Sequence, residues 1–90
     1  MRAISFTKQY KKDFKLMVKR GVDVDEIKTV IALLANDISL DPRYLDHPLQ
    51  GDKNNTRDCH IQNDWVLFYI KKGKNSLQLV RTGTHADLFR

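Results

Sequence analysis

The sequence has 90 residues and a mass of 10.5 kDa, the size of one small domain spanning residues 1–90. Apolar residues make up 41% and charged residues 30% of it, a balance that excludes a disordered chain and a membrane protein. The longest uncharged stretch, residues 29–36, is far shorter than the roughly 20 residues that span a bilayer. The first residues form no apolar signal sequence, so we expect a cytoplasmic protein. The single cysteine, Cys59, excludes an internal disulfide.

Positive charge is concentrated near the N-terminus. Residues 1–20 contain seven Lys or Arg and one Asp, residues 21–50 are net acidic, and residues 51–90 are net basic, which gives a total of +5. Clustered basic residues are typical of a surface that binds nucleic acid or an acidic partner. An ordinary solvated helix face would show the same pattern, so charge alone leaves both interpretations open.

The first part of the chain predicts one strand and two helices. Apolar residues alternate within residues 2–6, which indicates a short strand, and Thr7 is suited to cap a helix. Residues 8–20 place apolar side chains three and four positions apart, with lysines on the other faces. A glycine ends this helix, and a second apolar stripe predicts another helix capped by Asp23 or Asp25. We expect the two helices to form an antiparallel hairpin.

The second half predicts a sheet. Residues 40–55 hold both prolines and show no periodicity, so we expect a connecting loop. Strands are predicted at residues 56–61, 65–71 and 76–82, and the short turns between them favour an antiparallel meander. The middle strand is apolar on both faces, as expected of a central strand covered by the helices on one side. The predicted fold class is α+β, with the helical hairpin on one face of a small antiparallel sheet.

Three histidines occur in this second half. His47 precedes the meander, His60 ends its first strand, and His85 follows its last strand. The ends of alternate strands of a meander lie at one edge of the sheet, so the three side chains can converge there. Imidazole is the side chain best matched to proton transfer near neutral pH. Taken singly, each histidine is as well explained by a structural or surface role.

Cleavage of an RNA strand requires groups of this kind. A base must deprotonate the ribose 2′-OH, a cation must stabilise the phosphorane-like transition state, and an acid must protonate the departing 5′-oxygen. Asp58, Asp64 and Arg81 accompany the histidines in sequence. A metal site is a competing use, but the histidines lack the spacing of a metal-binding motif. A cysteine hydrolase is disfavoured because Cys59 alternates with Asp58 and His60 along a strand and faces the other way.

Four segments carry the most specific pattern in the chain. They read Asp46-His47-Pro48-Leu49-Gln50-Gly51, Arg57-Asp58-Cys59-His60, Asn63-Asp64-Trp65-Val66-Leu67 and Arg81-Thr82-Gly83-Thr84-His85-Ala86-Asp87-Leu88-Phe89. In this order and spacing they resemble the YafQ-type toxins of the RelE/ParE superfamily. The resemblance implies the RelE-like fold and a ribosome-dependent mRNA endonuclease that cuts mRNA in the A site, with neither cofactor nor metal.

The resemblance also implies the roles of individual residues. The catalytic set would be His47, His60, Asp64, His85 and Asp58, with His47 as the base and His85 as the acid. The substrate-binding set would be Arg81, Trp65, Phe89 and Arg57. The ribosomal RNA contacts would be Lys8, Lys11, Lys12, Lys15 and Lys19 of the first helix, where exposed positive charge suits phosphate binding.

Structural roles are open for the same residues. Trp65 and Phe89 are equally suited to packing, and Arg57 and Arg81 to pairing with Asp58 and Asp64 across adjacent strands.

The implied partners are a cognate antitoxin protein, the 70S ribosome and mRNA, with operator DNA bound only through the antitoxin complex and no membrane. An acidic, partly disordered antitoxin segment would suit the basic surface. The main alternative is a ParE-like toxin that inhibits DNA gyrase and cuts no RNA, and a second is a noncatalytic RNA-binding module. The histidines with Asp64 discriminate between them, because a pure binding protein has no chemical need for this set.

Overall fold

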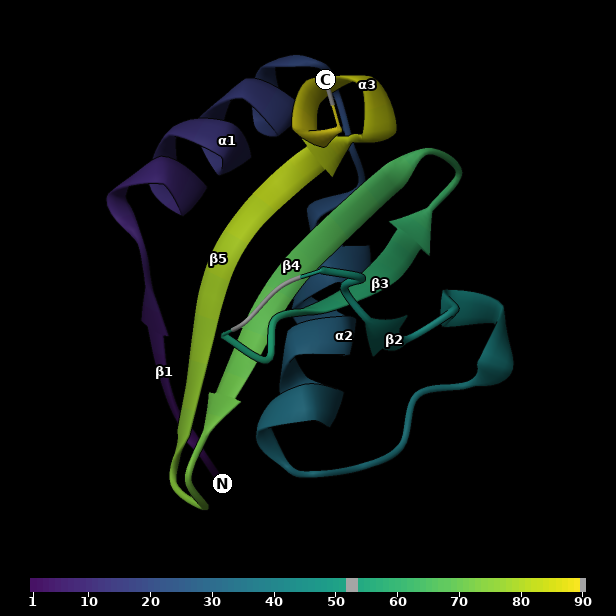
Figure 1. Cartoon of the computed structure of the whole chain (residues 1–90). Coiled ribbons are helices and arrows are strands. Elements are labelled where there is room, and N and C mark those ends of the chain that lie inside the picture. The colour runs from purple at the N-terminus through teal and green to yellow at the C-terminus, as the bar shows by residue number, and fades with distance from the viewer. Residues whose placement is uncertain (52–53, 90) are drawn as a thin grey trace.

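The computed structural model describes residues 1–51 and 54–89, which build a five-stranded sheet with two helices on one side (Figure 1). The sheet order is β1-β5-β4-β3-β2. The strands are β1 (Ala3–Phe6), β2 (His47–Pro48), β3 (Arg57–Gln62), β4 (Trp65–Lys72) and β5 (Ser76–Thr84). The helices are α1 (Lys8–Lys19), α2 (Val24–Ala35), the 3-10 helix η1 (Pro42–Tyr44) and α3 (His85–Leu88).

The predicted N-terminal strand and two helices are present, with ends close to the expected ones. Thr7 caps α1, since its hydroxyl accepts a hydrogen bond from the Tyr10 N–H at 2.9 Å. Asp23 caps α2 by accepting from the Asp25 N–H at 3.0 Å. Gly21 lies between the helices with φ +86°, a left-handed conformation that favours glycine. α1 runs along β5, and α2 returns behind the sheet in roughly the opposite direction (Figure 1).

The predicted meander is confirmed. β3 pairs antiparallel with β4, and β4 pairs antiparallel with β5. β4 is the central strand, and its residues from Trp65 to Tyr69 are all buried. The apolar side chains on both faces of β4 are therefore buried.

The prediction of a wholly antiparallel sheet was wrong at one edge. β1 pairs parallel with β5, with Ala3 opposite Ser76 and Phe6 opposite Leu79. Alternation of apolar residues predicts a strand but carries no information on its direction in the sheet. The loop predicted at residues 40–55 also contains η1 and the short strand β2, which pairs antiparallel with β3.

The core lies between α1, α2 and the face of the sheet that they cover. It comprises Tyr10, Met17, Ile27, Val30, Leu34, Ala35, Tyr44, Cys59, Ile61, Trp65, Leu67, Tyr69, Leu77 and Leu79. Cys59 is completely buried there, and burial strongly raises the pKa of its thiol. Because neighbours on a strand face opposite sides, Asp58 and His60 project from the other face of β3. Within residues 1–51 and 54–89, the helices are too short and too polar to cross a bilayer.

Candidate active site

The three histidines meet on the sheet face that α1 and α2 leave open. His60 projects from β3, His47 lies on β2 opposite Asp58, and His85 begins α3 directly after β5. The centres of the His47 and His60 rings are 6.4 Å apart, and those of His60 and His85 are 4.9 Å apart. His60 therefore lies between the other two, and the strand ends converge in the way that the meander allows.

Asp64 holds His85 by a short hydrogen bond. The Nδ1 atom of His85 lies 2.5 Å from Oδ1 of Asp64, and the His85 backbone N–H donates to the same oxygen at 3.4 Å. The pairing of Trp65 with Thr84 sets this geometry, because Asp64 precedes one of these residues and His85 follows the other. A proton on Nδ1 is thereby shared with a carboxylate, and Nε2 is the nitrogen left for chemistry. Both side chains are substantially exposed, as a residue that meets a substrate must be.

His47 is oriented from the opposite side by the backbone. Its Nδ1 atom lies 2.5 Å from the carbonyl oxygen of Leu45, an oxygen that can only accept, so Nδ1 carries the proton. Leu45 itself has φ +50°, a left-handed turn at the end of η1 that aims this carbonyl at the ring. The Nε2 atom of His47 then faces Asp58, with 3.6 Å between Nε2 and Oδ2.

Asp58 is the buried carboxyl of the site. Asp58 is 3% exposed, and its Oδ1 atom has no hydrogen-bond partner within the described residues. Burial raises the pKa of Asp58, and the positive charge available on His47, His60 and His85 opposes that rise. The net effect is a raised pKa. The Asp58 carboxyl, which lies directly beside the histidines, therefore holds a proton more readily than a solvated carboxyl does.

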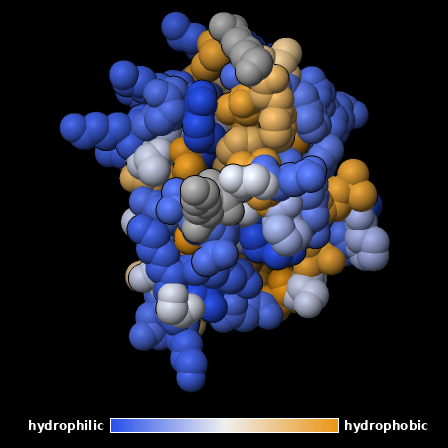
Figure 2. All heavy atoms as spheres, viewed as in Figure 1, coloured by the Kyte–Doolittle hydropathy of each residue, from blue (hydrophilic) through white to orange (hydrophobic). Residues whose placement is uncertain are grey.

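Phe89 closes one side of the site. Its ring stacks on His85 with 5.4 Å between centres, and its edge contacts Phe68 of β4, also at 5.4 Å. Phe89 is nevertheless 48% exposed. Figure 2 shows apolar residues gathered around the position of α3, on a surface that is otherwise largely hydrophilic. An exposed ring beside a histidine is suited to stacking on a base.

Trp65, which we expected in the substrate-binding set, lies in the core and not beside the histidines. Its side chain is 3% exposed, packs in the core, and donates a hydrogen bond from Nε1 to Oγ1 of Thr82 at 2.7 Å. This burial supports the structural role that the sequence left open for Trp65, and its substrate-binding role stays a prediction. Its place directly after Asp64 makes it an anchor for the turn that carries that residue.

The two arginines of the substrate-binding set have acidic partners that sequence reasoning missed. Arg57 shares the face of β3 that carries Cys59, away from the histidines, and its Nε donates to Asp46 at 3.1 Å. Arg81 makes two hydrogen bonds to Asp13 of α1, at 2.9 and 3.0 Å. The expected pairing of either arginine with Asp58 or Asp64 is therefore wrong, and the Arg57 side chain lies outside the histidine cluster.

The lysines of α1 are all exposed, as predicted. They form a basic surface on the outside of the helix, opposite the residues that pack on β5, and comprise Lys8, Lys11, Lys12, Lys15 and Lys19. The side chains of this surface are available to phosphate groups.

Two further features near the site were not predicted from the sequence. One is Phe68, whose ring supports Phe89. The other is the ion pair between Arg20, after α1, and Asp87 in α3. The signal for α3 was present, because Thr84 and Asp87 have the spacing of a capping box.

The site has no arrangement of metal ligands. In residues 1–51 and 54–89, no group of three or more His, Cys, Asp or Glu side chains has the geometry to hold a metal ion.

The chain was compared with known proteins. The model of the YafQ family, bacterial toxins of type II toxin–antitoxin systems, matches residues 2–90. The mRNA interferase toxin YafQ of Escherichia coli strain K12 is 45% identical over 89 residues, which cover 98% of this chain and 96% of that protein. The toxin in the E. coli DinJ–YafQ complex superposes with a TM-score of 0.90 at 42% identity, over 100% of both chains. A metal-bound toxin from Helicobacter pylori superposes with a TM-score of 0.92 at 43% identity, over 99% of this chain and 100% of that one.

These matches cover almost the whole chain, including the strands and turns that bring the three histidines together. The protein therefore belongs to the YafQ family of bacterial toxins of type II toxin–antitoxin systems.

Proposed function

We propose that this protein is an endoribonuclease that cuts mRNA in the ribosomal A site by general acid and base catalysis with its histidines. The observation that carries the proposal is the meeting of His47, His60 and His85 with Asp58 and Asp64 on an open sheet face. The name of the E. coli relative, an mRNA interferase toxin, supports the same activity.

His47 is the base in this mechanism. With its Nδ1 proton donated to the Leu45 carbonyl, the neutral ring presents the lone pair of Nε2, which can remove the proton of a ribose 2′-OH. The oxygen formed attacks the adjacent phosphorus, and the bond from phosphorus to the 5′-oxygen breaks. Asp58, close to Nε2, stabilises the imidazolium that results.

His85 is the acid. Asp64 stabilises the protonated ring and fixes its orientation through Nδ1, so that Nε2–H can protonate the departing 5′-oxygen. His60 lies between base and acid, where its ring N–H can donate to a nonbridging oxygen of the phosphorane-like transition state. Phe89 stacks on His85 and offers its exposed ring to a neighbouring base.

The partners follow from the same proposal. The exposed lysines of α1 bind ribosomal RNA phosphates, which makes association with the ribosome fall steeply with added salt. A cognate antitoxin neutralises the toxin, as the complex of the E. coli relative with DinJ suggests, and operator DNA is bound only by the toxin–antitoxin complex. The protein would act in the cytoplasm as a single domain spanning residues 1–90.

A toxin that inhibits gyrase, as in the ParE branch of the superfamily, is not favoured. The family match is to YafQ, and a protein that only binds gyrase has no use for a proton-transfer set on an open face.

The test is primer extension on a defined mRNA in a purified translation system. Wild-type protein should produce discrete cuts at codons positioned in the A site, and His47→Ala and His85→Ala should each lower the cleavage rate by roughly 100-fold or more. Lys28→Ala, on the exposed side of α2, is the matched control and should cut like wild type. Intact mRNA with normal translation would refute the proposal, and a gyrase supercoiling assay would follow.

A further inference from the structure

The catalytic helix α3 is too short to hold its position alone. It has four residues, His85–Leu88, and none of them is buried. An isolated turn of helix is unstable in water, so its placement depends on contacts with the rest of the molecule. These contacts matter for chemistry because α3 begins with His85 and ends next to Phe89.

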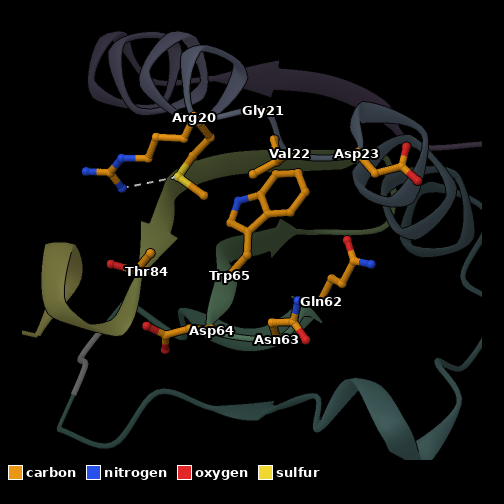
Figure 3. A pocket seen from close by; sticks show the side chains of 10 residues that line it. Arg20, Gly21, Val22, Asp23, Gln62, Asn63, Asp64, Trp65 and Thr84 are labelled. Atoms are coloured by element: carbon orange, nitrogen blue, oxygen red, sulfur yellow. Dashed lines mark hydrogen bonds between the residues drawn. The ribbon is translucent and has the colours of Figure 1, made fainter.

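Arg20 connects this helix to α1. Its Nη1 atom lies 2.6 Å from Oδ2 of Asp87, and its Nη2 atom lies 3.4 Å from Oδ1. No other hydrogen bond or ion pair joins α1 to α3 within residues 1–51 and 54–89. Figure 3 shows the Arg20 side chain extending from the end of α1 toward the region of Thr84, where β5 passes into α3.

Asp87 is itself fixed at the start of α3. Its Oδ2 atom accepts a hydrogen bond from the Thr84 N–H at 3.0 Å, and its own N–H donates to Oγ1 of Thr84 at 3.2 Å. Gly83 permits this close approach, since a Cβ at that position would lie 3.2 Å from both Cβ and Oδ2 of Asp87. The Arg20 hydrogen bond holds the pKa of Asp87 well below its usual range, so the carboxylate is charged at neutral pH.

A cavity of about 530 Å³ adjoins the Arg20 contact. It lies between the loop that joins α1 to α2 and the turn that carries Asp64, and its lining includes Arg20, Asp64, Trp65 and Thr84 (Figure 3). A displacement of α3 relative to this turn would lengthen the hydrogen bond from His85 to Asp64.

We propose that Arg20 is a positioning residue of the active site: through Asp87 it fixes α3 and thereby sets His85 against Asp64 and Phe89 against Phe68. This inference rests on the proposed endoribonuclease function for its kinetic consequence, although the position of α3 is a property of the fold alone. Arg20 belongs to the basic N-terminal region, yet its role differs from that of the lysines that bind RNA.

The test compares Arg20→Ala with Lys28→Ala, which removes an exposed positive charge from α2, away from both the histidines and the lysines of α1. Arg20→Ala should lower the single-turnover cleavage rate at saturating ribosomes roughly 10- to 100-fold, because misplaced catalytic groups are costly. Lys28→Ala should leave the saturated rate near that of wild type, and Lys19→Ala supplies the reference for a loss of ribosome binding. Arg20→Lys should restore part of the rate, because an ammonium group can make only the shorter of the two contacts to Asp87.

A second readout needs no ribosome. The NMR signals of the Phe89 ring report its contacts with His85 and Phe68. They should move toward those of an unstructured phenylalanine in Arg20→Ala and stay in place in Lys28→Ala. If wild-type protein cuts no mRNA, the proposed function fails, while the NMR comparison still decides whether Arg20 positions α3.

Two results would overturn the inference. One is an Arg20→Ala protein with unchanged Phe89 signals and a wild-type rate at saturation. The other is a loss in Arg20→Ala that appears only as weaker ribosome binding, equal to that of Lys19→Ala, which would make Arg20 one more phosphate contact.

Discussion

Replacement of Asp58 by Asn should make the protein more stable and less active. The Asp58 carboxyl is buried, its Oδ1 atom has no hydrogen-bond partner in the described residues, and its Oδ2 atom lies 3.6 Å from Nε2 of His47, beyond hydrogen-bond distance. The amide has nearly the same shape and removes the charge, which costs more to bury than a neutral polar group does. We therefore expect the free energy of unfolding to rise by roughly 1–2 kcal/mol. For a domain of this size, that corresponds to a rise in Tm of roughly 5–15 °C.

The pH dependence of this effect has a defined sign. The pKa of Asp58 is raised in the folded state, chiefly by burial. Below the unfolded pKa, roughly 3.9, the group is protonated in both states and its charge has no cost. As the pH rises toward the folded pKa, the unfolded state releases its proton first and the folded state loses relative stability. The Tm difference between Asp58→Asn and wild type should therefore be small near pH 3 and largest near pH 7.

Thermal unfolding followed by circular dichroism at several pH values measures this difference, and the primer-extension assay measures activity. Cleavage by Asp58→Asn should fall by roughly tenfold or more, because His47 loses the carboxylate that stabilises its protonated form. A variant that unfolds at a lower temperature than wild type near pH 7 would show that Asp58 forms a net stabilising ion pair with the histidines, and the reasoning from desolvation would be refuted.

Two further substitutions test the assignments around the sheet. Trp65→Phe removes the hydrogen bond to Thr82 and some core volume, which should lower the free energy of unfolding by about 2 kcal/mol. The cleavage rate of the folded protein should not change. A folded but inactive variant would show that Trp65 belongs to the substrate site. Asp13→Asn leaves Arg81 without its carboxylate partner and should cost about 1–3 kcal/mol at pH 7. Burial acts to raise the pKa of Asp13, but hydrogen bonds from Arg81, Gln9 and the Thr82 N–H outweigh it, and the pKa is lowered. The stability lost in Asp13→Asn, measured by chemical denaturation, should therefore shrink as the pH falls through that lowered pKa. A loss that does not depend on pH would contradict the ion pair.

The elements that sequence predicted well are those long enough to repeat a pattern. α1, α2 and the three strands of the meander each contain several apolar residues at a fixed period, and their caps and turns have specific chemistry. β2, with the two residues His47 and Pro48, and α3, with four residues, are too short to repeat a strand or helix pattern. Both are formed by tertiary contacts, and both carry histidines of the candidate site.

The partners of charged side chains were the least predictable part. Arg81 bonds to Asp13, which lies among the lysines of α1, and this contact exists only because α1 packs beside β5. Arg57 bonds to Asp46 because the chain before β2 passes the edge of β3. Asp58 is next to Arg57 in sequence and on the same strand, but alternation places it on the other face of the sheet. The alternation along a strand limits which acidic residues an arginine can reach, and the arrangement of the strands and helices determines which of them it pairs with.

The parallel pairing of β1 with β5 governs when this protein can become active during its synthesis. β1 leaves the ribosome early, but its only partner strand within the described residues is β5, so β1 has no strand to pair with until β5 emerges. Contacts between such distant parts of a chain form late and fold slowly. A nascent chain that ends before β5 has the basic helix but neither a complete sheet nor His85. Under the proposed function, the ribosome that makes this enzyme is thus protected from it until the catalytic strands have been released.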